Sequence, residues 1–237
     1  MTRWKGRAAP MKQFIDRDDA GRRLAVALHQ RLPGHRAGDG TVVLALPRGG
    51  VPVAAQVAAA LGAPLGLLIV RKVGAPSQPE LAMGAVASGG VVIRNEPVIR
   101  AIGLSEAAFA RATALAEAEL AAKERLYGTR AGPADIAGKT VILVDDGAAT
   151  GATMRAAVAA AKKRSAARVV VALPTASEEA AAALATGADD LVCLDTPEPY
   201  FAVGYWYRDF AQVGDDEVAR LLENAGRGGS ATPAREA

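Results

Sequence analysis

The residues V-I-L-V-D-D-G-A-A-T-G-A-T, at positions 141–153, are the most informative run in the sequence. Its four leading apolar residues, 141–144, have the composition of a short strand that is buried on both faces. Asp145 and Asp146 follow at once, and a loop of small residues then leads into an alanine-rich segment, 154–163, that favours helix. The run therefore predicts a strand, a loop and a helix, with two carboxylates at the carboxyl end of the strand.

This arrangement is typical of a site for a sugar phosphate. Ligands of open parallel sheets bind outside the carboxyl ends of the strands, and a helix that begins there offers unpaired N–H groups to an anion. Asp145 and Asp146 can accept hydrogen bonds from vicinal hydroxyls, or hold Mg²⁺ through its water shell. The alternative is a hairpin turn at Asp146-Gly147 with Thr150 as a helix cap. The hairpin is disfavoured because it needs a second strand after the turn, and the segment that follows is instead rich in alanine and favours helix.

The run resembles the phosphoribosyl pyrophosphate (PRPP) motif of type I phosphoribosyltransferases over thirteen contiguous residues. The resemblance implies that Asp145 and Asp146 bind the ribose hydroxyls and, through water, Mg²⁺. It also implies that the loop cradles the 5-phosphate of PRPP. The loop residues are Gly147, Ala148, Ala149, Thr150, Gly151, Ala152 and Thr153.

Composition indicates a globular protein with a substantial core, because half of the 237 residues are apolar. The formal charge of +3 comes from 28 basic and 25 acidic residues, so no nucleic-acid partner is indicated. No run approaches the length of a membrane span, and no membrane partner is expected. The single cysteine, Cys193, excludes an internal disulfide and favours a cytoplasmic location.

Strands and helices alternate along the chain, which predicts an α/β fold with a mainly parallel twisted sheet and helices on both faces. One domain is expected over residues 11–223, between a disordered extension at 1–10 and a disordered tail at 224–237. The resemblance adds a small hood that is built partly from residues 195–215. The expected strands lie at 41–46, 66–70, 141–144, 168–173 and 190–194, and the expected helices at 16–31, 53–61, 105–127, 154–163 and 178–185.

A second loop follows the carboxyl end of the strand at 41–46 and contains Arg48, Gly49 and Gly50. An arginine and bare backbone amides suit the oxygens of a pyrophosphate. A plain strand-to-helix turn that needs glycine is the alternative. Beside the run at 141–153, this loop resembles the pyrophosphate loop of the same family.

The segment 71–80 holds two cations, a glycine and two prolines, and it is expected to be a long exposed loop. The resemblance implies a mobile lid that closes over the substrates and brings cations to the leaving pyrophosphate. Arg71 and Lys72 are the catalytic candidates, and Glu80 could add a carboxylate. The alternative for the two cations is that they are solvated charges at the end of a strand.

Six of the ten aromatic residues lie within eleven positions, 200–210. Tyr200, Phe201 and Trp206 are candidates for binding the acceptor, because rings stack on a planar base. Packing against the edge of the sheet is an equally good interpretation of the same residues.

The resemblance implies that the protein transfers the 5-phosphoribosyl group of PRPP to a nitrogen of a small acceptor and releases pyrophosphate. A nucleobase is the expected acceptor, and Mg²⁺ is the expected cofactor. Purine-salvage members of the family place an aspartate at the position of Ala149. Its absence here makes a 6-oxopurine a less favoured acceptor. A binding protein that senses PRPP or a nucleotide without turnover is the competing hypothesis. The oligomeric state stays open, with a homodimer as one possibility.

Overall fold

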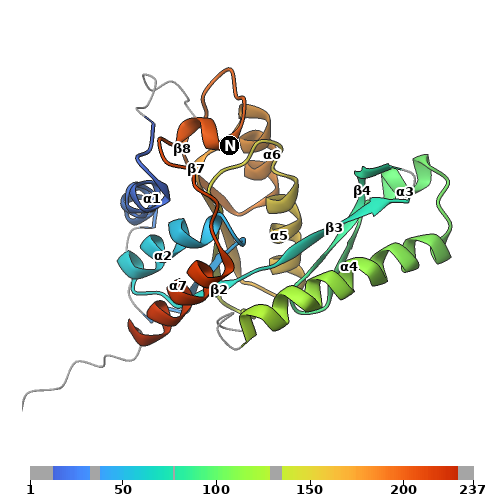
Figure 1. Ribbon diagram of the computed structural model, residues 1–237, viewed down its shortest axis with the longest axis horizontal. Coiled ribbons are helices and arrows are strands. Elements are labelled where there is room, and N and C mark those ends of the chain that lie inside the picture. The colour runs from blue at the N-terminus through green and yellow to red at the C-terminus, as the bar shows by residue number, and fades with distance from the viewer. Residues whose placement is uncertain (1–12, 33–37, 77, 129–134, 229–237) are drawn as a thin grey trace, which may run out of the picture.

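The computed structural model describes residues 13–32, 38–76, 78–128 and 135–228 (Figure 1). Its main body is built on a five-stranded sheet in which every neighbouring pair is parallel, in the order β2-β1-β6-β7-β8. The expected α/β architecture is confirmed. The strands are β1 (Thr41–Ala45), β2 (Leu65–Leu67), β6 (Thr140–Val144), β7 (Arg168–Thr175) and β8 (Asp190–Asp195).

Helices cover both faces of this sheet, as expected (Figure 1). The strands are apolar on both faces, and alternate residues feed two separate cores. In β6, Ile142 packs into the core on the side of α1, α2 and α7, whereas Leu143 packs into the core under α5 and α6. The helices are α1 (Arg17–Arg31), α2 (Gly50–Leu61), α5 (Ala152–Lys163), α6 (Glu178–Gly187) and α7 (Asp215–Gly228).

A second unit, residues 70–127, extends away from the main body and is called the arm here (Figure 1). It contains a separate antiparallel sheet of three strands, along which the long helix α4 lies. Val73 and Met83 of this sheet are buried with Phe109 and Leu120 of α4. The elements of the arm are β3 (Val70–Ala75), β4 (Gln78–Ala87), β5 (Val91–Arg94), α3 (Glu96–Ala101) and α4 (Glu106–Tyr127).

Two sequence-based expectations are corrected here. The segment expected as a long loop at 71–80 forms most of β3 and the start of β4, because the two strands pair with each other and α4 covers one face. Helix α7 runs to Gly228, so the first five residues of the expected disordered tail at 224–237 are helical. The extension expected at 1–10 lies outside the described residues.

The sheet brings two loops together at one edge. β1 and β6 are adjacent and in register at their ends, where Ala45 pairs with Val144 and the N–H of Leu46 donates to the Val144 carbonyl at 2.9 Å. The loop at 47–49 and the loop at 145–151 therefore begin side by side. This adjacency of two carboxyl ends is the feature of the fold that builds the candidate site.

Candidate functional site

The two glycines of the Arg48-Gly49-Gly50 turn lie directly against the acidic pair. A Cβ added at Gly49 would lie 2.6 Å from Cγ of Asp146, and one added at Gly50 would lie 2.8 Å from Cα of Asp145. No side chain fits at these distances, so the glycines are required by the approach of the two loops. The structure thus brings together the two motifs that the sequence singled out, although Gly50 and Asp145 are 95 positions apart in the sequence.

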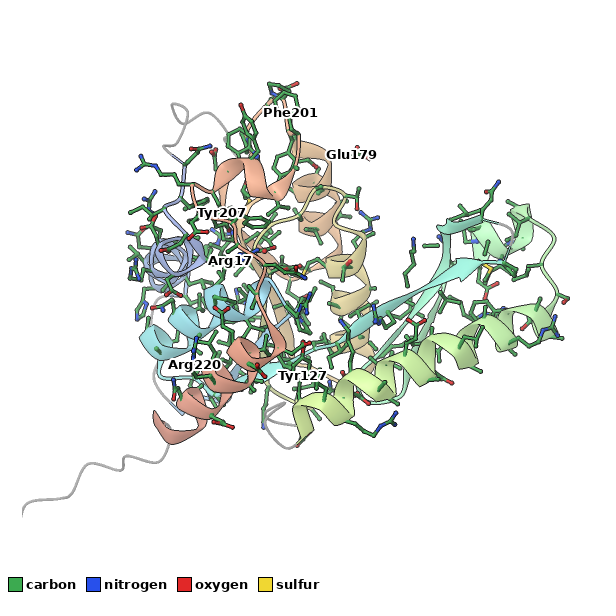
Figure 2. All side chains as sticks on the ribbon, in the orientation of Figure 1. Arg17, Tyr127, Glu179, Phe201, Tyr207 and Arg220 are labelled. Atoms are coloured by element: carbon green, nitrogen blue, oxygen red, sulfur yellow. The ribbon has the colours of Figure 1, made fainter. Side chains whose placement is uncertain are left out.

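Arg17, which the sequence analysis missed, occupies one side of the acidic pair. Its Nε lies 2.9 Å from Oδ2 of Asp146, and its Nη1 donates to the Ala211 carbonyl at 2.8 Å. The guanidinium carbon also lies 3.8 Å from the ring centroid of Phe210. Arg17 and Tyr207 approach each other between α1 and the sheet in Figure 2. The arginine therefore joins α1, the acidic pair and the aromatic segment.

The acidic pair is half-buried at the carboxyl end of β6. Burial, followed by the neighbouring charge of Asp146, holds the pKa of Asp145 well above the usual aspartate range. Burial also raises the pKa of Asp146, although the Arg17 guanidinium acts in the opposite direction. The Tyr207 hydroxyl donates to the Asp146 carbonyl at 2.6 Å and fixes the backbone there. Hydroxyl donors or a cation would compensate these half-buried carboxylates for the water contacts that burial removes.

The loop after the acidic pair is held from the opposite side by the β7–α6 connection. The N–H of Ala148 donates to the Thr175 carbonyl at 3.0 Å, and the Ser177 hydroxyl donates to the Ala149 carbonyl at 2.7 Å. Gly151 then adopts a left-handed conformation with φ of 66°, which only glycine takes without strain, and α5 begins at the next residue. The first amides of α5 consequently face the end of this loop, where an anion can accept from them.

Cations gather beside the Arg48-Gly49-Gly50 turn, where the arm meets the main body. Arg48 Nη1 lies 3.5 Å from Oδ2 of Asp215, whose Oδ1 accepts from the Tyr127 hydroxyl at 2.7 Å. Arg71 of β3 lies 3.8 Å from Glu119 of α4. Arg48 and Arg71 are thus each paired with a carboxylate. A third cation, a lysine of α4, lies nearby and leaves the group with a net positive charge.

That further cation is Lys123 of α4, which the sequence analysis did not single out. Burial lowers the pKa of Lys123, and the nearby positive charges of Arg71 and Arg48 lower it further. The sequence does not distinguish Lys123 from the other charged residues of its helix, because only the tertiary fold brings α4 close to Arg48 after β1. The three cations from separate elements form a surface that favours an anion.

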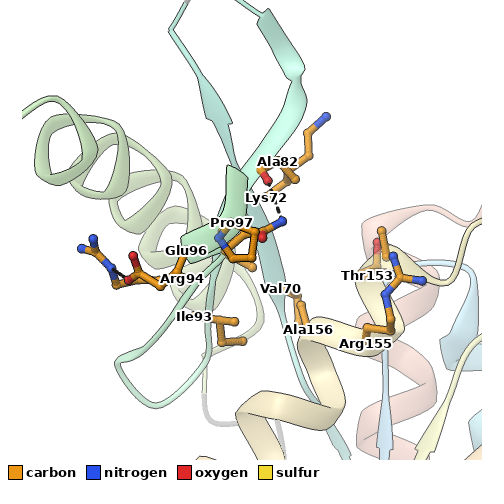
Figure 3. A pocket seen from close by; sticks show the side chains of 14 residues that line it. Val70, Lys72, Ala82, Ile93, Arg94, Glu96, Pro97, Thr153, Arg155 and Ala156 are labelled. Carbon is orange, nitrogen blue, oxygen red and sulfur yellow. Dashed lines mark hydrogen bonds and ion pairs between the residues drawn. The ribbon is translucent and has the colours of Figure 1, made fainter. Parts of the chain in front are cut away.

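Arg71 and Lys72 do not point to the same side. They are neighbours on a strand, so their side chains leave opposite faces of the small sheet. Arg71 faces α4 and Glu119, whereas Lys72 lines a cavity between the arm and α5 (Figure 3). Glu80 lies on β4, and its side chain is outside the described part of the chain. Arg71 therefore belongs to the group of cations beside Arg48, and Lys72 lies on the other face of the strand. The catalytic role of Arg71, Lys72 and Glu80 stays a prediction.

The aromatic candidates divide into an inner and an outer group. Tyr200 and Trp206 pack together with ring centroids 6.1 Å apart, and burial raises the pKa of Tyr200 to about 12. The Trp206 Nε1 is buried without a hydrogen-bond partner among the described residues, whereas the Tyr200 hydroxyl interacts with the Thr175 side chain. Phe201 is 66% exposed and lies at the outer tip of its loop (Figure 2). The inner pair are therefore the better candidates for ligand contact.

Among the described residues, no third carboxylate, histidine or cysteine joins the acidic pair as a metal ligand. Within the ranges that the structure describes, His, Cys, Asp and Glu form no group of three that could hold a metal ion. Any metal at this site would thus depend on Asp145 and Asp146 together with ligand oxygens. In those same ranges, no helix is long and apolar enough to cross a membrane.

Comparison with known proteins agrees with this geometry. Residues 16–208 match the family model described as phosphoribosyl transferase domain. A Mycobacterium tuberculosis protein named "Putative phosphoribosyl transferase Rv0571c" is 44% identical over 217 residues, which cover 92% of this chain and 48% of that protein. This chain thus spans about half the length of that relative.

A solved structure is similar over nearly its whole length. The crystal structure of TT1426 from Thermus thermophilus has a TM-score of 0.79 and 42% sequence identity, and the match covers 90% of this chain and 98% of that one. The family match includes both the acidic pair and the Arg48-Gly49-Gly50 turn. The resemblance stated from the motif at 141–153 is confirmed, and this chain belongs to the phosphoribosyl transferase family.

Proposed function

We propose that this protein transfers the 5-phosphoribosyl group of PRPP to a nitrogen of a small acceptor and releases pyrophosphate. The observation that carries the proposal is the meeting of three parts at one edge of the sheet. These are the half-buried acidic pair, the glycine turn after Arg48 that touches it, and the first amides of α5. Each part matches one section of PRPP: the ribose hydroxyls, the pyrophosphate and the 5-phosphate.

Asp145 and Asp146 would bind the ribose hydroxyls and a magnesium ion. Hard carboxylate oxygens suit Mg²⁺, which in proteins commonly combines one or two carboxylates with substrate phosphates and water. Asp146 already has Arg17 on its Oδ2, so its remaining oxygen and those of Asp145 are the protein atoms that would take part. Magnesium, when bound, would neutralise developing charge on the pyrophosphate.

In the proposed reaction, the bond between C1 of the ribose and the pyrophosphate oxygen breaks, and a bond from C1 to the acceptor nitrogen forms. The acceptor nitrogen loses its proton to solvent or to the departing pyrophosphate. Arg48, Arg71 and Lys123 would stabilise the negative charge that develops on the leaving group. The chain would contribute by positioning and electrostatics, which is sufficient for a displacement of this type.

The acceptor would enter beside Tyr200 and Trp206. The buried Nε1 of Trp206 lacks a hydrogen-bond partner among the described residues, and an acceptor with a carbonyl or ring nitrogen would accept from it. A nucleobase has this chemistry and a face that stacks on an aromatic ring. Ala149 stands where purine-salvage enzymes carry an aspartate, so a 6-oxopurine is not the favoured base.

Pyrophosphate release tests the proposal. The protein would be incubated with PRPP, Mg²⁺ and each member of a panel of purine, pyrimidine and non-nucleobase amines, and pyrophosphate would be measured by a coupled assay. Release that depends on one acceptor supports the transferase. Tight PRPP binding with no release for any acceptor would support the competing hypothesis of a PRPP sensor. The proposal also includes a cytoplasmic location and assembly as a homodimer.

A further inference from the structure

Helix α4 carries apolar side chains on a face that the rest of the described chain leaves open. Its inner face packs on the arm sheet through Phe109 and Leu120, whereas Leu115 is 71% exposed and Leu126 is 53% exposed. The helix lies at the outer edge of the arm, with one side turned away from the sheet (Figure 1). Because the two leucines lie three turns apart on one line, they belong to a single surface, which is typical of a contact with another molecule.

The sequence of this face is nearly symmetric about Leu115. An α-helix turns about 100° per residue, so positions three, four and seven before and after Leu115 lie within about 60° of it around the helix. Equal steps to either side carry residues of the same size or of opposite charge. The pairs are Ala112 with Ala118, Arg111 with Glu119, and Ala108 with Ala122. Such a face is complementary to itself when a second copy is turned end to end.

Arg111 and Glu119 supply the charge complementarity. In an antiparallel pair centred on Leu115, Arg111 of each copy lies opposite Glu119 of the other, whereas a parallel pair would bring like charges together. Among the residues that the structure describes, Arg111 has no carboxylate partner in its own chain. Glu119 has Arg71 at 3.8 Å, and a carboxylate has two oxygens that can accept from more than one cation. The charges therefore select the antiparallel arrangement.

Small side chains beside Leu115 leave room for a leucine of the second copy. A groove of about 570 Å³ lies between α4 and β3, and its helix side includes Ala108, Ala112, Leu115 and Ala116. Alanines let two helices approach closely, and a leucine of one helix packs between the side chains of the other. The groove is thus suited to Leu115 of another copy of the chain.

The extended arm gives a second copy enough space. Tyr127 marks the C-terminal end of α4 beside the main body, and the N-terminal end of the helix lies at the far end of the arm (Figures 1 and 2). Two antiparallel copies of this 22-residue helix place the two main bodies at opposite ends of a pair about 33 Å long. The main bodies therefore do not collide, and the acidic pair, which belongs to the main body, stays outside the contact.

We propose that the face of α4 around Leu115 joins two copies of this chain in an antiparallel pair, with the two-fold axis beside Leu115. Leu115 packs against Leu115 of the second copy, the alanines allow the helices to approach, and two Arg111–Glu119 ion pairs flank the centre. The inference rests on the homodimer that is part of the proposed function and not on the transfer reaction, so the two can fail separately.

Sedimentation velocity of the full chain at micromolar concentrations tests the surface. The wild type is expected to be a dimer, and Leu115→Glu should weaken dimerisation about tenfold or more, because two carboxylates would meet at the axis. Val26→Glu is the matched control, since Val26 is 61% exposed on α1, and it should dimerise like the wild type. Far-UV circular dichroism identifies variants that have kept the fold. A monomeric wild type, or a folded Leu115→Glu that dimerises like the wild type, would overturn the proposal.

A charge exchange tests the antiparallel register. Arg111→Glu and Glu119→Arg should each weaken self-association about tenfold or more, because each places like charges opposite each other. An equimolar mixture of the two folded variants should regain a dimer, since both ion pairs form again between unlike copies. Failure of the mixture to associate more tightly than either variant alone would contradict this register.

A cysteine at the axis locates the contact directly. Leu115→Cys should form a disulfide between two copies under mild oxidation, because the axis brings the two Cα atoms within disulfide range. Val26→Cys should not. The native Cys193 does not compete, since burial raises the pKa of its thiol to about 12. A dimeric Leu115→Cys protein that stays uncrosslinked would show that the copies meet elsewhere.

Pyrophosphate release measured on the same wild-type samples separates this inference from the proposed reaction. A monomer that releases pyrophosphate with one acceptor would refute the interface and support the transferase. A dimer that is disrupted by Leu115→Glu but releases no pyrophosphate with any acceptor would support the interface and refute the transferase.

Discussion

Arg17 Nε lies 2.9 Å from Oδ2 of Asp146, and this ion pair connects the first helix to the acidic pair after β6. The arginine is only 11% exposed and the aspartate 13%, so solvent screens the pair poorly. The same guanidinium rests on Phe210 and donates to the Ala211 carbonyl. A single side chain thus fixes the acidic pair relative to the segment where the acceptor is proposed to bind.

Arg17→Ala should lower stability and PRPP affinity together, because it leaves Asp146 charged, buried and without its cation. Loss of one partner of a buried pair costs about 3–5 kcal/mol. Arg17→Lys keeps the charge and should recover most of the PRPP affinity. Lysine cannot reproduce the stacking of the planar guanidinium on Phe210 together with the hydrogen bond from Nη1 to the Ala211 carbonyl. Isothermal calorimetry with PRPP and Mg²⁺ on both variants checks this, and equal affinities for the two would refute the role of charge.

Asp145→Asn should stabilise the protein while it weakens PRPP binding. The pKa of Asp145 is raised in the folded state, so the ionised carboxylate opposes folding. The stability that Asp145 contributes is greatest when it is protonated, at low pH, and is lost as the pH rises through its folded-state pKa. The gain from Asn should therefore appear at neutral pH and shrink as the solution is acidified.

The measurement for Asp145→Asn is the melting temperature between pH 4 and pH 8. Each 1 kcal/mol corresponds to about 2–4 °C for a chain of this size. Asn can still accept the hydrogen bond that Asp145 Oδ1 receives from the Asp146 N–H at 2.9 Å, so local geometry should persist. A lower melting temperature at neutral pH would show that the charged form supports the fold, contrary to the burial argument.

Gly49→Ala should weaken PRPP binding about tenfold or more by pushing the pyrophosphate turn away from Asp146. Its Cβ would lie 2.6 Å from Asp146 Cγ, and relief of such an overlap costs about 1–3 kcal/mol. The control is Gly187→Ala at the end of α6, where a Cβ meets nothing within 4 Å. Calorimetric titration with PRPP compares them, and wild-type affinity in Gly49→Ala would argue against contact between the two loops.

Lys123→Ala should weaken pyrophosphate binding at least tenfold, since it removes one of three neighbouring cations on the leaving-group side. Lys139→Ala is the control, because Lys139 lies in the turn before β6, where its Nζ donates to the Asp135 carbonyl at 3.0 Å. Pyrophosphate titration with Mg²⁺ gives both affinities. Equal pyrophosphate affinities for Lys123→Ala and the wild type would show that Lys123 does not contribute to pyrophosphate binding.

The sequence was informative wherever one local segment contained the whole pattern. The strand, the acidic pair and the glycine turn were predicted because composition and spacing over a few residues define them. Arg17 was missed because its partner Asp146 is 129 residues away, and no local pattern links them. Lys123 was missed for the same reason, since only the packing of α4 brings it to Arg48.

The segment at 71–80 shows a different limit of prediction from sequence. Its prolines, glycine and charges indicate a loop, but β3 and β4 satisfy each other's backbone groups and α4 buries Val73 and Ala75. Tertiary pairing outweighs weak local propensity here. The change matters for the site, because a strand sends Arg71 and Lys72 to opposite faces, where a loop could have aimed both at one ligand.

Binding of PRPP to the acidic pair is the central claim, and calorimetry with Mg²⁺ tests it most directly. The double variant Asp145→Asn with Asp146→Asn should lose at least 100-fold in PRPP affinity, about 2.7 kcal/mol, and should still fold. Asp209→Asn, at an exposed position in the aromatic segment, should bind PRPP like the wild type. Undiminished PRPP affinity in the folded double variant would contradict the account.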